Sequence, residues 1–232
     1  MSRYRNSSPC PNSRETVWGG LYFAFQLFLL PQLLQLGNTA LGSPLSAGEL
    51  NFTYFLINFL AVLFLFHDFL GRSASQVFHH PGLFCEGVIL GYVAYSACSV
   101  VINWLISQLA PGFSNANDAS IAAMGRQNGY LVFIGTVILV PPVEECLFRG
   151  VIFRNLYSKS PWAAYLISML AFALIHIVGF LGSYSPVDIL LCMLQYLPAG
   201  LCLAWSCILG QTIFAPIVIH ALVNAVGIYR LR

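Results

Sequence analysis

The chain has 232 residues, and only 18 of them carry a formal charge, 10 Lys or Arg and 8 Asp or Glu. Hydrophobic residues make up 58% and charged residues 8%, whereas a soluble domain carries roughly 25% charged residues. This composition excludes a soluble globular domain, which needs more surface charge, and a disordered chain, which is poor in apolar residues.

Long windows without charge divide the chain into apolar segments of a length near the roughly 20 residues that a spanning helix needs. Helices are expected rather than barrel strands, because polar and apolar residues do not alternate in segments such as 131–140. We predict an all-α, polytopic transmembrane helical bundle that forms a single domain over residues 1–232. Pro198 and Gly200 would split the sixth span, so about seven to eight spans are expected. The seven segments are 17–36, 52–70, 87–110, 130–151, 162–182, 187–209 and 213–229.

The basic residues near the two ends of the chain bear on its orientation. Arg3, Arg5 and Arg14 precede the first span. Because positive charge favours the cytoplasmic side, they predict a cytoplasmic N-terminus. Arg230 and Arg232 favour the same side for the C-terminus, which requires an even number of spans and conflicts with a count of seven.

Ionisable side chains inside a span are costly to bury, and a function is the default expectation for them. Asp68, Glu86 and Asp188 lie at span ends, where water reaches them, and are interpreted as boundary residues. The ionisable residues that lie within or close to spans are Glu144, Glu145, Arg149, His176 and His220.

Two consecutive prolines precede the first of these charges. Pro141 and Pro142 lack an N–H, so we expect the helix to break there and a new one to start near Pro142. Such a break is tolerated at membrane depth where it lines an enclosed or wet cavity. Glu145 and Arg149 are four residues apart and can pair on one helix face. Glu144 then points elsewhere, toward the cavity, unless the whole group is a structural charge cluster.

The remaining polar groups come from two other spans. His176 alone is compatible with a core histidine, and His220 and Asn224, which share a helix face, with hydrogen bonds between helices. Together with Glu144 they form a set that can activate a water and stabilise an oxyanion. Glu144, His176 and His220 could instead hold Zn²⁺, although the H-E-x-x-H pattern of zinc proteases is absent.

These residues resemble, in order, the three motifs of the CPBP intramembrane proteases. This group includes the type II CAAX prenyl endopeptidases and the Abi-like bacteriocin-processing and self-immunity proteins. The resemblance covers roughly residues 125–230. The motifs are Glu144-Glu145-x-x-x-Arg149, Phe172-x-x-x-His176 and His220-x-x-x-Asn224.

The resemblance implies a bundle of about eight transmembrane helices with the catalytic groups inside it. It assigns water activation to Glu144 and His176, and the oxyanion site to His220 and Asn224. It also favours a mechanism without a metal or other cofactor, with zinc as the alternative. The supporting positions are Glu145, Arg149 and Phe172.

The resulting hypothesis is an intramembrane endopeptidase that cleaves a membrane-associated peptide or protein. The alternative is a non-proteolytic immunity or scaffold protein that binds a peptide in the same cavity. A broken-helix transporter is a third possibility, although no internal repeat is visible. The expected partners are the substrate and the lipid bilayer, with no nucleic acid. The compact chain favours a bacterial cell membrane.

Overall fold

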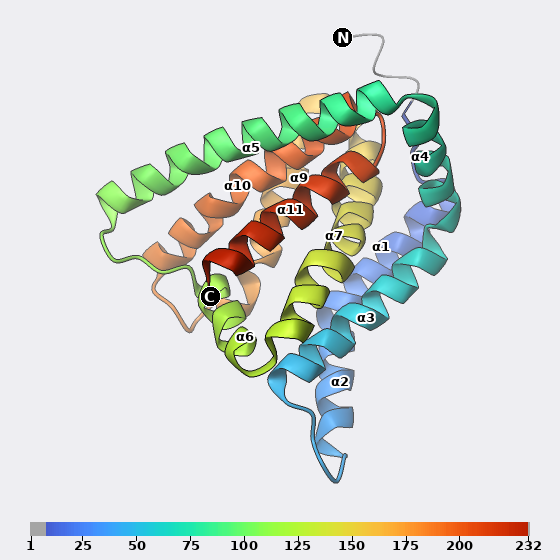
Figure 1. Cartoon of the computed structure of the whole chain (residues 1–232). Coiled ribbons are helices and arrows are strands. Elements are labelled where there is room, and N and C mark those ends of the chain that lie inside the picture. The colour runs from blue at the N-terminus through green and yellow to red at the C-terminus, as the bar shows by residue number, and fades with distance from the viewer. Residues whose placement is uncertain (1–7, 232) are drawn as a thin grey trace.

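The computed structural model describes residues 8–231, and all regular secondary structure in that range is helical. The predicted all-α class is therefore confirmed, whereas Arg3, Arg5 and Arg232 lie outside the described residues. In chain order the elements are α1 (Ser13–Phe28), α2 (Leu30–Thr39), α3 (Ala47–Leu65), α4 (His67–His79), α5 (Pro81–Leu109), α6 (Ala116–Ile134), η2 (Gly135–Leu139), α7 (Val140–Glu145), η3 (Cys146–Arg154), α8 (Asn155–Tyr157), α9 (Pro161–Ile175), η4 (Val178–Phe180), α10 (Pro186–Leu209) and α11 (Phe214–Arg230) (Figure 1).

The predicted apolar segments consist mainly of helix, although segment 162–182 continues beyond the end of α9 into turns and η4, and the predicted number of spans is not confirmed. By length and composition, four helices in the described range can cross a membrane, and a fifth is added if α1 and α2 form one span with a 43° bend. The helices α9, with 15 residues, and α11, with 17, are shorter. A 15-residue helix rises roughly 22 Å, against a hydrocarbon core of about 30 Å. The four helices are Ala47–Leu65, Pro81–Leu109, Ala116–Tyr157 and Pro186–Leu209.

The expected helix break at Pro141 and Pro142 is not confirmed, because the helical conformation continues through both prolines from η2 to α8. The α-helical turn α7 contains both prolines, and wider π-helical turns, η2 and η3, lie on either side of it. A π turn pairs residues five apart, so it can absorb the hydrogen bonds that the prolines remove. The irregular residue is Asn128, with φ −139° and ψ 54°, at the start of the predicted fourth span.

Pro198 does not divide the sixth span either, because α10 is one helix over Pro186–Leu209. Next to it, Gly200 allows a close approach to α9: a Cβ at this position would lie 2.8 Å from the Cα of Met169. A larger residue would therefore push α9 away from α10. These two helices each supply groups to the site described below.

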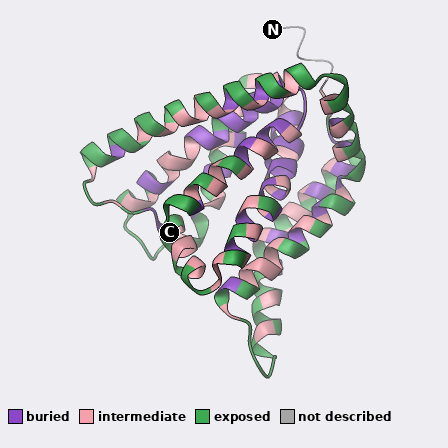
Figure 2. Ribbon diagram, in the orientation of Figure 1, coloured by how far each residue is buried: buried purple, intermediate pink, exposed green. Residues whose placement is uncertain are grey.

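The helices that carry the motifs form the buried part of the bundle. The helix α10 packs against α5 and α9, and α11 packs against α5, η2 and α7. Figure 2 shows buried residues gathered on α10, α11, α7 and η3, whereas α5 and the α2 end are largely exposed. Large apolar side chains such as Trp104, Leu109 and Trp162 are exposed on the outside, as expected for a surface that faces lipid.

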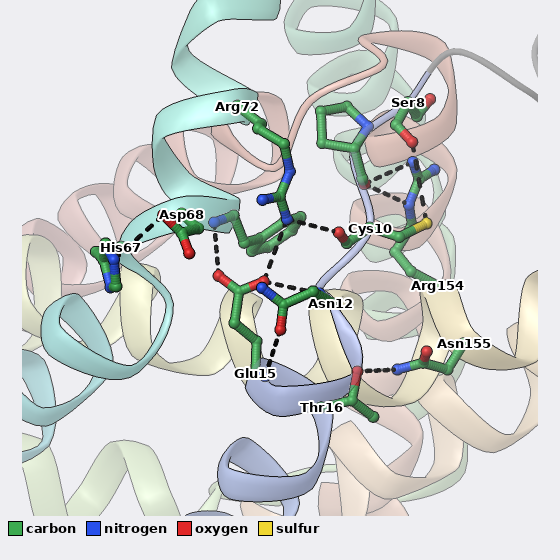
Figure 3. A network of polar contacts seen from close by, with 12 residues as sticks. Ser8, Cys10, Asn12, Glu15, Thr16, His67, Asp68, Arg72, Arg154 and Asn155 are labelled. Atoms are coloured by element: carbon green, nitrogen blue, oxygen red, sulfur yellow. Dashed lines mark hydrogen bonds and ion pairs between the residues drawn. The ribbon is translucent and has the colours of Figure 1, made fainter.

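A network of hydrogen bonds connects residues 9–15 with the helices α4 and η3 (Figure 3). Asn12 caps α1 together with Glu15, which is only 3% exposed. The Glu15 carboxylate accepts from the main-chain N–H of Phe69 at 2.6 Å and from Arg72 at 3.2 Å. Arg154 donates twice to the carbonyl of Pro9, at 3.1 and 2.8 Å. The start of α1, the start of α4 and the end of η3 therefore lie at one end of the molecule.

Candidate active site

Glu145 and Arg149 form a fully buried ion pair, with 3.1 Å between Oε1 and Nη1. The second guanidinium nitrogen, Nη2, donates to the carbonyls of Ala199 and Gly200 on α10, at 3.2 and 3.3 Å. The guanidinium carbon lies 4.3 Å from the centre of the Phe172 ring. Arg149 therefore connects the first motif with α10 and with the second motif.

The same Glu145 oxygen also holds the third motif, because it lies 2.8 Å from Nδ1 of His220. This oxygen also accepts from Arg149, so it acts as an acceptor and Nδ1 of His220 is the donor in this contact. This fixes the orientation of the imidazole and directs the chemistry to Nε2. The ring edge of Phe172 packs against His220, with 5.7 Å between ring centres at 72°.

His176 caps the C-terminal end of α9, where its imidazole is fixed by two contacts. Nδ1 donates to the carbonyl of Phe172 at 2.8 Å, which again leaves Nε2 for chemistry. The ring of Tyr196 from α10 stacks on the imidazole, with 4.2 Å between centres at 24°. The Tyr196 hydroxyl accepts from the amide of Asn117 at 2.9 Å. Tyr196 is a site residue that carries no recognisable motif in the sequence.

Asn224 is positioned by the unusual helix that contains the prolines. Its Nδ2 donates to the carbonyl of Thr136 in η2 at 2.7 Å. The residues four and five positions after Thr136 cannot donate to that carbonyl, because the N–H of Val140 bonds to Gly135 and Pro141 has no N–H. Pro141 therefore leaves the Thr136 carbonyl without a main-chain donor, and this carbonyl accepts from Asn224 of the third motif.

Glu144 lies between the two histidines. Its Oε2 is 3.9 Å from Nε2 of His176 and 3.9 Å from Nε2 of His220. This oxygen is buried and has no hydrogen-bond partner among residues 8–231. The side chain also lines a cavity of about 40 Å³ between α1, α3, α7 and α9. The structure thus brings Glu144, His176 and His220 together around one point, with Glu145 and Arg149 behind them.

The donor atoms do not form a metal site in this arrangement. Within residues 8–231, no three His, Cys, Asp or Glu side chains come close enough to hold a metal ion. Zinc bonds to imidazole nitrogen and carboxylate oxygen at about 2.0–2.2 Å, so neighbouring tetrahedral ligands are separated by less than the 3.9 Å found here. We therefore assign no step of the reaction to a metal.

The residues interpreted as span boundaries lie away from this site. Asp68 and Glu86 are exposed at the starts of α4 and α5, and Asp188 is half-buried in the first turn of α10, where it accepts from the Ser185 hydroxyl. A buried charge that the sequence interpretation missed is Glu15. The capping-box spacing of Asn12 and Glu15 was the signal that could have identified it.

Comparison with protein families agrees with this geometry. Residues 126–226 match the family described as type II CAAX prenyl endopeptidase, Rce1-like. We refer to this matched segment as the Rce1-like domain. It contains all three motifs, from Glu144 to Asn224, and confirms the resemblance to the CPBP proteases. No curated protein and no solved structure gave a match to the chain.

The Rce1-like domain belongs to a family of membrane proteases, and the apolar helices described above agree with an integral membrane protein. The helices α1 to α5 precede the matched segment. They nevertheless contact it, because α3 packs against η2 and α7, and α1 packs against η3.

Proposed function

We propose that this protein is an intramembrane endopeptidase that hydrolyses a peptide bond of a membrane-associated peptide or protein. The observation that carries the proposal is the convergence of Glu144 Oε2 on the Nε2 atoms of His176 and His220, at 3.9 Å each, inside an Rce1-like domain. Three groups that can exchange protons thus surround one point in a buried site.

The geometry supports a hydrolytic water held by Glu144 and His176. Two hydrogen bonds of about 2.8 Å each can bridge the separation of 3.9 Å between the carboxylate and the imidazole, so this distance supports a single bridging water. As this water attacks the substrate carbonyl, its proton passes to this pair, and the pair then delivers a proton to the leaving amine.

His220 and Asn224 are suited to stabilise the oxyanion that forms in this attack. His220 can donate from Nε2 when both of its ring nitrogens carry a proton, and Nδ1 already donates to the Glu145 carboxylate. Asn224 uses one amide hydrogen on Thr136 and retains the other for a substrate oxygen. Preorganised donors of this kind each contribute about 10²–10³-fold to the rate.

Replacing the central carboxylate tests the proposal. The protein in proteoliposomes would be incubated with a farnesylated CAAX peptide and with a library of unprenylated, membrane-inserting fluorogenic peptides. Glu144→Gln removes the base but keeps the shape, so we expect cleavage to fall by about 10²–10⁴-fold. Glu86→Gln, the same change at an exposed position on α5, should cleave as the wild type does.

Cleavage that survives Glu144→Gln would contradict the mechanism. If the wild type cleaved no probe, and Glu144→Gln retained every measurable effect of the wild type in cells, the endopeptidase function itself would be wrong. The non-proteolytic alternative would then account for the cavity.

A further inference from the structure

The wall of the cavity opposite Glu144 comes from α1 and α3, outside the matched segment. Gln26 on α1, and Tyr54 and Asn58 on α3, line the cavity together with Glu144. These three residues belong to none of the motifs. Gln26 and Asn58 are buried, with 3% and 2% of their surfaces exposed.

Most polar groups of this wall are already paired with one another. Tyr22 donates through its hydroxyl to Oδ1 of Asn58 at 2.7 Å, and Nδ2 of Asn58 donates to the carbonyl of Tyr54 at 2.9 Å. The Tyr54 hydroxyl donates to the main-chain carbonyl of Gln26 at 3.2 Å. These bonds tie α1 to α3 and hold the wall in one arrangement.

The side-chain amide of Gln26 is the exception. Within residues 8–231 it has no hydrogen-bond partner, although the residue is 97% buried. Buried polar groups are normally satisfied, and an unsatisfied amide is costly to retain in place of an apolar side chain. The side chain of Glu144 lines the same cavity, and its carboxylate has a buried oxygen, Oε2, without a hydrogen-bond partner in the described range. One cavity is therefore lined by two side chains, Gln26 and Glu144, that have polar atoms without partners in residues 8–231.

The size of the cavity indicates what these groups hold. Its 40 Å³ is room for about three waters, because one water needs roughly 10–15 Å³ measured in this way. A buried water also needs two to four polar partners. The Gln26 amide offers two donors and an acceptor, and Glu144 offers a further acceptor.

We propose that this cavity is a water-holding site of the hydrolytic reaction, in which the Gln26 amide and the Glu144 carboxylate hold water beside the reacting groups. The inference rests on the proposed endopeptidase function. Gln26 is then a positioning residue for water, and α1 and α3 complete an active site whose motifs all lie in the Rce1-like domain. Such a supply is needed because hydrocarbon surrounding the bundle contains almost no water.

The test is Gln26→Met, which keeps the length of the side chain and removes its hydrogen bonds. We expect kcat for the fluorogenic peptides to fall by tenfold or more with KM unchanged, while the thermal unfolding temperature stays the same or rises. Gln26→Asn, which retains the amide, should recover part of the lost kcat. The matched control is Gln35→Met on α2, where Gln35 is exposed and does not line the cavity.

Other outcomes would overturn the inference. A wild-type kcat in Gln26→Met, a rise in KM alone, or a loss of kcat that follows a fall in unfolding temperature would each exclude a water-holding role. A structure at a resolution that shows waters gives a readout independent of activity. Water density within hydrogen-bonding distance of both the Gln26 amide and Glu144 is expected in the wild type and not in Gln26→Met. If this water density is present but none of the peptides is cleaved, the proposed endopeptidase function is wrong. The water-holding site is then still supported.

Discussion

At the scale of single residues, Arg149 is the charge on which the site depends. Its guanidinium is fully buried and touches Glu145, two carbonyls of α10 and the ring of Phe172. A buried charge needs several partners at once to offset the loss of water, and this one has them on three different elements. The four-residue spacing predicted the pair with Glu145, whereas the contacts with α10 carbonyls depend on the tertiary fold.

Arg149→Ala leaves the Glu145 carboxylate buried without its cation. Breaking one partner of a buried pair costs about 3–5 kcal/mol, and each kcal/mol lowers the unfolding temperature of a chain of this size by roughly 2–4 °C. We expect the unfolding temperature in detergent to fall by about 10 °C. Arg126→Ala, which removes an exposed arginine, should leave it within a degree or two of the wild type. Equal unfolding temperatures for the two variants would mean that the pair does not stabilise the fold.

Tyr196 is the second residue whose role can be isolated. Its ring holds the His176 imidazole by stacking, and its hydroxyl contacts Asn117. Tyr196→Phe keeps the ring, so we expect nearly wild-type cleavage. Tyr196→Leu removes the stack and should lower kcat by about tenfold or more, since small displacements of a catalytic group are costly. The measurement is the separate determination of kcat and KM. A rise in KM with unchanged kcat would instead indicate contact with the substrate.

At the scale of elements, the two prolines that precede the first motif help to position the third motif. Pro141 frees the Thr136 carbonyl, which then holds Asn224, and the π-helical turns let the helix continue past both prolines. The rule that proline ends a helix predicted a break, because sequence patterns do not show whether a neighbouring turn can widen. The apolar segments themselves were predictable, since their length and lack of charge follow directly from burial in lipid.

Pro141→Ala tests this arrangement. The new N–H can donate to the Thr136 carbonyl and compete with Asn224 for it. We expect kcat to fall while the unfolding temperature is unchanged or higher, because a helix-interior N–H is restored. Pro142→Ala is the matched control, since its N–H lies one residue further along and is not expected to reach Thr136. Equal activity in both variants would show that the proline does not position Asn224.

The motifs predicted which ionisable residues form the candidate site, but they did not predict the neutral residues that line it. Glu144, His176 and His220 could be placed in one site because they are ionisable and lie in apolar segments. Gln26 and Tyr196 are neutral and have no spacing that distinguishes them from other polar residues of membrane helices. Their roles depend on which helices pack together, and that is a property of the three-dimensional fold.

At the scale of the whole molecule, several basic residues gather at the end of the bundle where α1 starts, whereas Arg230 lies at the opposite end, where α11 ends, and not on the same side as the N-terminus as the sequence predicted. Arg72 and Arg154 both contact the first described residues at the end where α1 starts, and Arg14 and Lys159 lie close by in the chain. The α10–α11 turn lies at the same end, because Thr212 donates to the carbonyl of Ser73 at 2.8 Å. The start of α10, at Pro186, therefore lies toward the opposite end.

This distribution predicts that the end with α4 and η3 faces the cytoplasm, since positive charge is retained on that side. Cys10, which is exposed at this end, provides a test when the other cysteines are replaced by serine or alanine. A membrane-impermeant maleimide should label it only after the cells are permeabilised. A matched variant with Ser183→Cys as its only cysteine places the thiol in the exposed turn before α10, and it should be labelled in intact cells. The reverse pattern would place the N-terminal end outside. Labelling of both positions in intact cells would mean that the start of α1 and the turn before α10 lie on the same side of the membrane.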